Sequence, residues 1–144
     1  MRFQFLVENK TDHPDIMAEH GLSIYIEADH QRVLFDAGAT DLLLLNAERM
    51  GVDLTAVDFA VVSHGHYDHT GGIPGFCTLN DTAPVYLHRD AFRKSYGLEG
   101  GRREKETCGL RWTQQEKEKL KDRLVLTDGP RYITENICIT GTIP

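Results

Sequence analysis

The sequence predicts an α+β fold, in which a mixed β-sheet carries its helices on one face. Two observations support this prediction: short apolar runs rich in β-branched and aromatic residues recur along the chain, and segments of helical periodicity separate them. Three of these runs come first, at residues 3–7, 22–27 and 32–35, and a short polar turn at 29–31 separates the last two. They predict the opening strands of the sheet.

The next elements alternate between helix and strand. A helix is predicted over residues 41–50, because Thr40 can cap its amino end, Gly51 can end it, and an apolar stripe lies along it. The apolar stripe is formed from among Leu42, Leu43, Leu45 and Met50. Further along, the predicted elements are a buried strand at 57–62, a short helix at 73–79, a strand at 85–87 and a helix at 89–95.

Residues 97–111 are rich in glycine and charge, which predicts a loop or an insertion. Its arginines, Arg102, Arg103 and Arg111, match phosphate geometry and could clamp a substrate phosphate, although a solvated surface loop is the simpler interpretation. After it, Thr113-Gln114-Gln115-Glu116 is a capping-box pattern that opens a polar helix to about residue 123. The predicted closing strands are residues 124–127, 132–134 and 137–140.

The most informative segment, residues 63–72, reads Ser-His-Gly-His-Tyr-Asp-His-Thr-Gly-Gly. It directly follows the predicted strand at 57–62, where a strand end meets a glycine-rich turn, a common place for a site on a rigid scaffold. Four metal-competent side chains lie within six positions: His64, His66, Asp68 and His69. Structural zinc sites are usually rich in cysteine, and this cluster has none, so the pattern favours a catalytic metal site.

The spacing of this cluster suits two ions. Alternation at a strand end points His64 and His66 in the same direction, and Gly65 between them lets the backbone turn. Asp68 and His69 lie beyond the turn and can face a second ion. Imidazole and carboxylate suit zinc, iron or manganese. We therefore expect two divalent ions, with zinc as the first candidate.

This segment resembles the His-x-His-x-Asp-His signature of the metallo-β-lactamase superfamily of metal-dependent hydrolases. Four other segments resemble its dihydropterin-ribofuranosyl-aminobenzene-phosphate synthase-like subgroup: Glu19-His20-Gly21-Leu22-Ser23, Leu34-Phe35-Asp36-Ala37-Gly38, Asn46-Ala47 and Ile139-Thr140-Gly141-Thr142-Ile143-Pro144. The resemblance spans essentially the whole chain and implies an αββα sandwich. It assigns His64 and His66 to one metal, and Asp68 and His69 to the other.

The chain also departs from the family pattern. Superfamily members supply further ligands in a second half, whereas this sequence reaches Pro144 with four ligands for two metals. We therefore expect residues 1–144 to form a single, truncated domain that resembles the amino-terminal half of the sandwich. One face of its sheet would then be exposed, and large apolar patches rarely stay exposed in monomers. A homodimer, a partner chain that supplies the missing half, and a chain cut short are the alternatives.

Other polar residues are weaker candidates. The resemblance brings the loop of His20 near the site, where it would contact substrate or order a ligand, against the alternative of an ordinary loop histidine. For His88, a surface or capping role is favoured over metal binding. The resemblance implies that Asp36 accepts a hydrogen bond from a ligand imidazole, against the alternative of a residue in a helix-entry turn.

Composition limits the remaining possibilities. A net charge of −6 argues against general nucleic-acid binding, and no apolar run approaches the roughly 20 residues that span a bilayer. Cys77, Cys108 and Cys138 are odd in number and irregularly spaced, which indicates reduced thiols and a cytoplasmic protein. One of these thiols could approach a metal, although a buried or idle thiol is the favoured interpretation.

The predicted function is that of a metal-dependent hydrolase whose binuclear centre activates water for attack on an ester or phosphodiester-type bond. Asp68 would be catalytic, orienting the attacking water and relaying its proton. The expected substrate is a small molecule, which can be phosphorylated. The alternative is a non-catalytic metal-binding fragment that lacks the later ligands. A flavodiiron-like redox role is a weaker third option, since those relatives carry an acidic ligand in place of one motif histidine.

Overall fold

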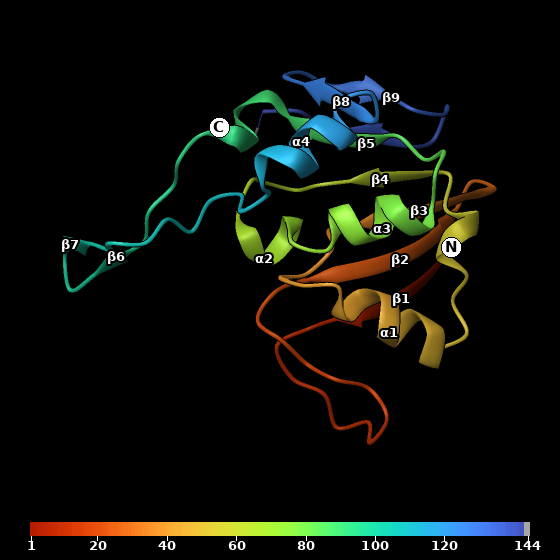
Figure 1. Ribbon diagram of the computed structural model, residues 1–144. Helices are drawn as coiled ribbons and strands as arrows, with labels where there is room; N and C mark the ends of the chain where they lie inside the picture. The colour runs from red at the N-terminus through yellow and green to blue at the C-terminus, as the bar shows by residue number, and fades with distance from the viewer. Residues whose placement is uncertain (143–144) are drawn as a thin grey trace.

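A mixed six-stranded sheet forms the centre of the structure, a computed structural model that describes residues 1–142 (Figure 1). Its strands lie in the order β1 (Arg2–Val7), β2 (Ser23–Ala28), β3 (Gln31–Phe35), β4 (Phe59–Val61), β5 (Val85–His88) and β8 (Leu124–Thr127). β1, β2 and β3 form an antiparallel meander, and β4, β5 and β8 continue the sheet in parallel to β3. The predicted α+β class and the mixed sheet are confirmed.

Three helices pack on one face of this sheet: α1 (Leu42–Arg49), α3 (Ile73–Leu79) and α4 (Gln114–Leu120) (Figure 1). A single apolar core lies between the two layers and draws alternate residues from the strands, such as Leu34 and Leu87, and residues such as Leu43 and Phe76 from the helices. The predicted Thr40 cap was wrong by one residue: α1 begins at Leu42 with Asp41 as its N-cap, and the Thr40 hydroxyl accepts from the Leu42 amide.

The capping box predicted from the sequence is also confirmed. The Thr113 hydroxyl accepts from the Glu116 amide, and the Glu116 carboxylate accepts from the Thr113 amide at the start of α4. Of the other helical turns, η1 (Leu54–Ala56) precedes β4, and α2 (Tyr67–Thr70) follows it. No helix among residues 1–142 combines the length and apolar character that a membrane span requires.

Two local predictions were wrong in extent or place, and the predicted loop has some structure of its own. The helix expected at 89–95 is only a 3-10 turn, η2 (Arg89–Phe92). The loop at 97–111 contains a short hairpin of β6 (Leu98–Glu99) and β7 (Arg102–Arg103), which projects from the body of the molecule (Figure 1). The last two predicted strands form a separate hairpin, β9 (Arg131–Tyr132) and β10 (Cys138–Ile139), rather than joining the sheet.

The face of the sheet away from the helices is apolar and only partly covered. A groove of about 470 Å³ runs between residues 136–141, around β10, and apolar side chains of the sheet. These side chains include Phe3, Ile26, Val33, Phe35, Phe59 and Val61. Phe3 is 53% exposed and Phe5 is 56% exposed, whereas Phe59, next to the hairpin, is 2% exposed. Residues 143 and 144, which end the last family-like segment, lie outside the described residues.

Candidate metal centre

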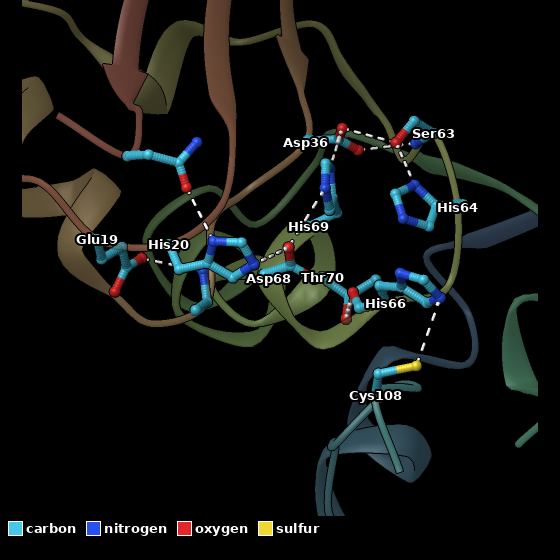
Figure 2. A network of polar contacts seen from close by, with 12 residues as sticks. Glu19, His20, Asp36, Ser63, His64, His66, Asp68, His69, Thr70 and Cys108 are labelled. Atoms are coloured by element: carbon cyan, nitrogen blue, oxygen red, sulfur yellow. Dashed lines mark hydrogen bonds and ion pairs between the residues drawn. The ribbon is translucent and has the colours of Figure 1, made fainter. Parts of the chain in front are cut away.

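The histidine-rich segment gathers at the carboxyl end of β4, and α2 begins within it (Figure 2). The ring of His64 lies 4.4 Å from that of His66 and 4.2 Å from that of His69, measured between centroids. Oδ2 of Asp68, a residue that is 8% exposed, lies 3.6 Å from Nε2 of His69. The fold therefore brings together all four residues that the sequence proposed as ligands.

Asp36, at the end of β3, organises this cluster. It is fully buried, and its backbone has a φ of 56°, in the left-handed region where Asp and Asn are the commonest non-glycine residues. Its carboxylate accepts from the amide and the hydroxyl of Ser63, each at 2.7 Å, and lies 2.7 Å from Nδ1 of His69. The predicted hydrogen bond between Asp36 and an imidazole of the motif is confirmed.

These contacts orient two imidazoles of the motif. A carboxylate accepts, so Nδ1 of His69 carries a proton and donates it to Asp36. The Ser63 hydroxyl donates to Asp36, so at 2.9 Å from Nδ1 of His64 its oxygen accepts, and Nε2 of a neutral His64 then has a lone pair. Ser63 was not singled out from the sequence, because its role depends on the neighbouring end of β3.

The two imidazoles differ in basicity. The hydrogen bond from His69 to Asp36 raises the pKa of His69. Burial, followed by the charges of His69 and His66, lowers the pKa of His64. A lowered pKa keeps His64 neutral at physiological pH, which is the form that binds metals.

His20 reaches the same cluster from the loop before β2. Its Nε2 lies 3.3 Å from Oδ2 of Asp68, and its Nδ1 lies 2.8 Å from Oδ1 of Asn9. Gly21 permits this approach, because its φ is 141° and a Cβ there would lie 2.2 Å from the carbonyl oxygen of Asp68. The prediction that this loop lies near the site is confirmed, and His20 contacts one of the proposed ligands.

His88 has the capping role that the sequence favoured. Its Nδ1 accepts from the Asp90 amide at the start of η2, and its Nε2 lies 3.0 Å from the Thr142 hydroxyl. It also lines a cleft of about 380 Å³ that includes His64 and His66. His88 therefore forms part of the wall of the site.

The end of the 97–111 segment is held against α2, which the sequence did not predict. The Tyr67 amide donates to the carbonyl of Cys108 at 3.0 Å, and the Arg111 guanidinium lies 3.7 Å from the centre of the Tyr67 ring. The Trp112 indole donates to the carbonyl of Thr70 at 2.8 Å. Sγ of Cys108 consequently lies 3.6 Å from Nε2 of a motif histidine, His66 (Figure 2).

The arginines of the segment line a separate pocket of about 540 Å³. Arg102, Arg103 and Arg111 are accompanied there by Lys105 and three glutamates, so the lining carries mixed charge. The guanidinium of Arg103 also lies 3.6 Å from the centre of the Tyr96 ring. The phosphate clamp considered from the sequence remains a prediction.

The proposed ligand atoms are of types that bind divalent metals, and two pairs of them have the spacing of two ligands on one ion. Two ligands of a tetrahedral zinc ion, with bonds near roughly 2.0–2.3 Å, lie about 3.3–3.6 Å apart. Asp68 and His69, at 3.6 Å, and His66 and Cys108, also at 3.6 Å, have this spacing. Within residues 1–142, however, no three His, Cys, Asp or Glu side chains are arranged as a set that could hold an ion. Each half of the proposed centre therefore has an incomplete ligand set.

Comparison with known proteins finds two similar proteins from one organism. The chain is 33% identical over 143 residues to an uncharacterised protein of Methanocaldococcus jannaschii, covering 98% of this chain and 53% of that protein. It is 30% identical over 132 residues to the 7,8-dihydropterin-6-methyl-4-(beta-D-ribofuranosyl)-aminobenzene-5'-phosphate synthase of the same organism, covering 88% of this chain and 45% of the synthase. The chain thus spans about half the length of these relatives.

Solved structures show the same fold. Tm1679, a metal-dependent hydrolase of the beta-lactamase superfamily, matches with a TM-score of 0.68 and 25% identity, over 96% of this chain and 47% of Tm1679. A subclass B3 metallo-beta-lactamase from a soil metagenome, MEM-A1, matches with a TM-score of 0.52 and 18% identity, over 84% of this chain and 46% of MEM-A1. Residues 17–131 match the Metallo-beta-lactamase superfamily. The chain therefore belongs to the Metallo-beta-lactamase superfamily.

Proposed function

We propose that this chain carries the ligands of a binuclear metal centre that hydrolyses an ester or phosphodiester-type bond. His64 and His66 would bind one divalent ion, and Asp68 and His69 would bind the other. Zinc is the first candidate, with iron and manganese as alternatives, because imidazole and carboxylate donors suit all three. When bound, such ions supply Lewis acidity and a water of lowered pKa.

The observation that carries this proposal is the hydrogen-bond network of Asp36. It orients His69 so that Nε2 lies 3.6 Å from the carboxylate oxygen of Asp68. A cation between these two groups would be bound by both, with Nε2 of His69 in its deprotonated form. A buried carboxylate that orients a ligand imidazole is a common outer partner of metal sites. The network therefore supports the proposed metal centre.

In this proposal the residues of the chain position the reactants. Asp68 orients the attacking water and accepts its proton, and His20 steadies the Asp68 carboxylate from the open side at 3.3 Å. The cleft bordered by His64, His66 and His88 would admit a small-molecule substrate.

A second candidate function is group transfer on a phosphorylated substrate. One curated relative is named a synthase of an aminobenzene-5'-phosphate compound rather than a hydrolase. The arginines at 102, 103 and 111 would hold such a phosphate beside Tyr67. Loss of turnover of phosphorylated substrates alone in an Arg111→Gln variant would favour this candidate over a general hydrolase.

We also propose that a second copy of this chain or a partner chain completes the centre. The apolar face around Phe3 and Phe5 is exposed, and each half of the proposed centre lacks ligands. A chain packed on this face would cover the exposed apolar side chains and could supply the missing ligands. Large apolar patches are usually interaction surfaces. Light scattering that gives a stable monodisperse monomer holding two metal ions would contradict this proposal.

The direct test is metal content per chain, followed by hydrolysis assays on phosphodiesters and thioesters. We expect about two ions per chain in the completed assembly, and a steep fall in hydrolysis in an Asp68→Ala variant. Asp122→Ala is the matched control, since Asp122 is an exposed carboxylate. Metal binding without any hydrolysis that depends on Asp68 would indicate the alternative, a non-catalytic metal-binding fragment.

A further inference from the structure

Strand β1 is an edge of the six-stranded sheet, and within residues 1–142 only β2 pairs with it (Figure 1). An edge strand presents a row of main-chain N–H and C=O groups on its outer side, and proteins usually block such a row with proline, inward-pointing charge or a covering segment. The side chain of Asn46 donates to the carbonyl of Leu6, near the end of β1, at 2.7 Å. The residues before it, 2–5, read Arg-Phe-Gln-Phe and contain no proline. This part of β1 is therefore an open edge.

The turn between β2 and β3 shows in which direction the main-chain groups of β2 point. Its two central residues, Asp29 and His30, have φ values of 51° and 60°, as in a type I′ turn. The pair that closes this turn, Ala28 and Gln31, is therefore hydrogen-bonded. The alternation along β3 agrees, because the Asp36 amide, an odd number of residues further on, donates to β4 instead.

The same alternation identifies the outward-facing groups of β1. In a strand between two antiparallel neighbours, successive residues bond to opposite sides. Ala28 bonds to β3, so Tyr25, three residues earlier, bonds to β1, where its partner is Gln4. The neighbours of Gln4, which are Phe3 and Phe5, consequently direct their main-chain N–H and C=O groups away from the sheet.

We propose that a second copy of this chain pairs with this edge, β1 against β1 in antiparallel orientation, about a twofold axis at Gln4. Phe3 of each copy then lies opposite Phe5 of the other, and each pair exchanges both its N–H and its C=O groups. The two side chains point to the same face of the sheet and are 53% and 56% exposed. The pairing therefore brings exposed aromatic rings of both copies together, and such cross-strand pairs stabilise a sheet.

The charge of the strand also suits pairing with itself. Arg2 is the charged residue of β1, and in this register it lies opposite Leu6 of the second copy. The two arginines are then about 13 Å apart along the strands. Arg2 also lies 4.0 Å from Glu27 of its own copy. The opposite edge of the sheet, β8, is instead flanked by charged residues at 121–123 and 128.

This contact uses the edge of the sheet, whereas the chain proposed above to complete the metal centre packs on its face. The inference is therefore independent of the metal centre. Cysteine substitution at the twofold axis tests its geometry. Position 4 of each copy would form a pair without hydrogen bonds, whose Cα atoms lie about 4.5 Å apart, within the range that a disulfide spans. We expect Gln4→Cys to give an intermolecular disulfide on mild oxidation, located by mass spectrometry. Leu126→Cys, on β8, should give none.

A second variant measures the strength of the contact. Phe5→Lys should raise the dissociation constant of the dimer by at least about tenfold, because it removes the aromatic pairs and places a lysine on the edge. Sedimentation velocity over a range of concentrations gives this constant. Leu126→Lys is the matched control, since Leu126 is 50% exposed on the opposite edge, and it should leave the dimer unchanged.

Hydrogen exchange on the unmutated chain covers the case in which a variant fails to fold. The amides of Phe3 and Phe5 should exchange at least about tenfold more slowly at concentrations where the dimer forms. A chain that is monomeric at every concentration would overturn the inference. A dimer whose Phe3 and Phe5 amides stay unprotected, and whose Gln4→Cys variant does not cross-link, would also overturn it and would leave a second copy on the face of the sheet.

Discussion

Nδ1 of His69 lies 2.7 Å from Oδ2 of Asp36, a carboxylate that is fully buried between the ends of β3 and β4. The pair links two strand ends that are adjacent in the sheet but separated by α1 in the sequence. It places a charged acceptor behind an imidazole whose other nitrogen faces the cluster. The orientation of the proposed ligands therefore depends on the pairing of β3 with β4.

An Asp36→Asn substitution tests this dependence. Asn tolerates the φ of 56° at this position and can still accept from the Ser63 amide, so the fold should be retained. Loss of the anionic acceptor should weaken zinc binding by about 10–100-fold, as is typical for outer partners of metal ligands. Calorimetric zinc titration measures the effect. Asp29→Asn, on an exposed turn, is the control, and equal zinc affinities in both variants would contradict the prediction.

A Gly65→Ala substitution should disrupt the metal-binding turn. A Cβ at this position would lie 2.1 Å from the carbonyl oxygen of Ala91, which belongs to the backbone of η2. Either the turn or η2 must shift, so we expect a loss of roughly 1–3 kcal/mol in the free energy of unfolding and weaker metal binding. Gly129→Ala is the control, because nothing lies within 4 Å of its added Cβ. Denaturant unfolding of the two variants gives the comparison.

A Trp112→Phe substitution should loosen α2. The Trp112 side chain is 6% exposed and donates to the carbonyl of Thr70 at 2.8 Å. Leaving this buried carbonyl without its donor should cost about 1–3 kcal/mol and lower the melting temperature by several degrees. Thermal unfolding followed by circular dichroism checks this. Tyr132→Phe, at a residue that is 72% exposed, should leave the melting temperature unchanged.

The two cysteines outside the cluster should differ in reactivity. Because burial raises the pKa of Cys77 to about 11, its thiolate fraction at pH 8 is about a thousandth, and alkylation should be about a hundredfold slower than at exposed Cys138. Timed iodoacetamide labelling with mass spectrometry measures both rates, and equal rates would contradict the prediction. The pKa of the Cys77 thiol is 9.0 in the unfolded chain and about 11 in the folded chain, so the thiol ionises first in the unfolded chain. The free energy of unfolding therefore falls as the pH rises from about 9 to about 11.

The sequence was most informative where local patterns and local chemistry coincide. The apolar runs gave the first three strands, because hydrophobic alternation reports directly on a buried sheet face. The capping box at Thr113 placed the start of α4 correctly, since its hydrogen bonds join residues three apart. The histidine motif spans six residues and was recognised at once for the same reason.

Predictions failed where a distant segment decides the local structure. The helix expected at 89–95 stops at Phe92 because the following backbone pairs with the returning loop, where the Cys108 amide donates to Ser95. Residues 132–134 and 137–140 have strand-like composition, but they contribute to a separate hairpin across the apolar face instead of extending the sheet. Strand propensity does not say which partner a strand takes.

The sequence by itself determined the α+β class, the family and the four proposed ligands, because each is encoded in residues close together along the chain. The resemblance pointed to Asp36 and to the loop of His20, whereas only the tertiary structure placed Ser63 and Cys108 beside the cluster and gave the contacts of all four. Those contacts depend on strand order, on the left-handed backbone at Asp36 and on the path by which the 97–111 segment returns. Such long-range packing has no short sequence signature, and it decides how the proposed ligands are oriented.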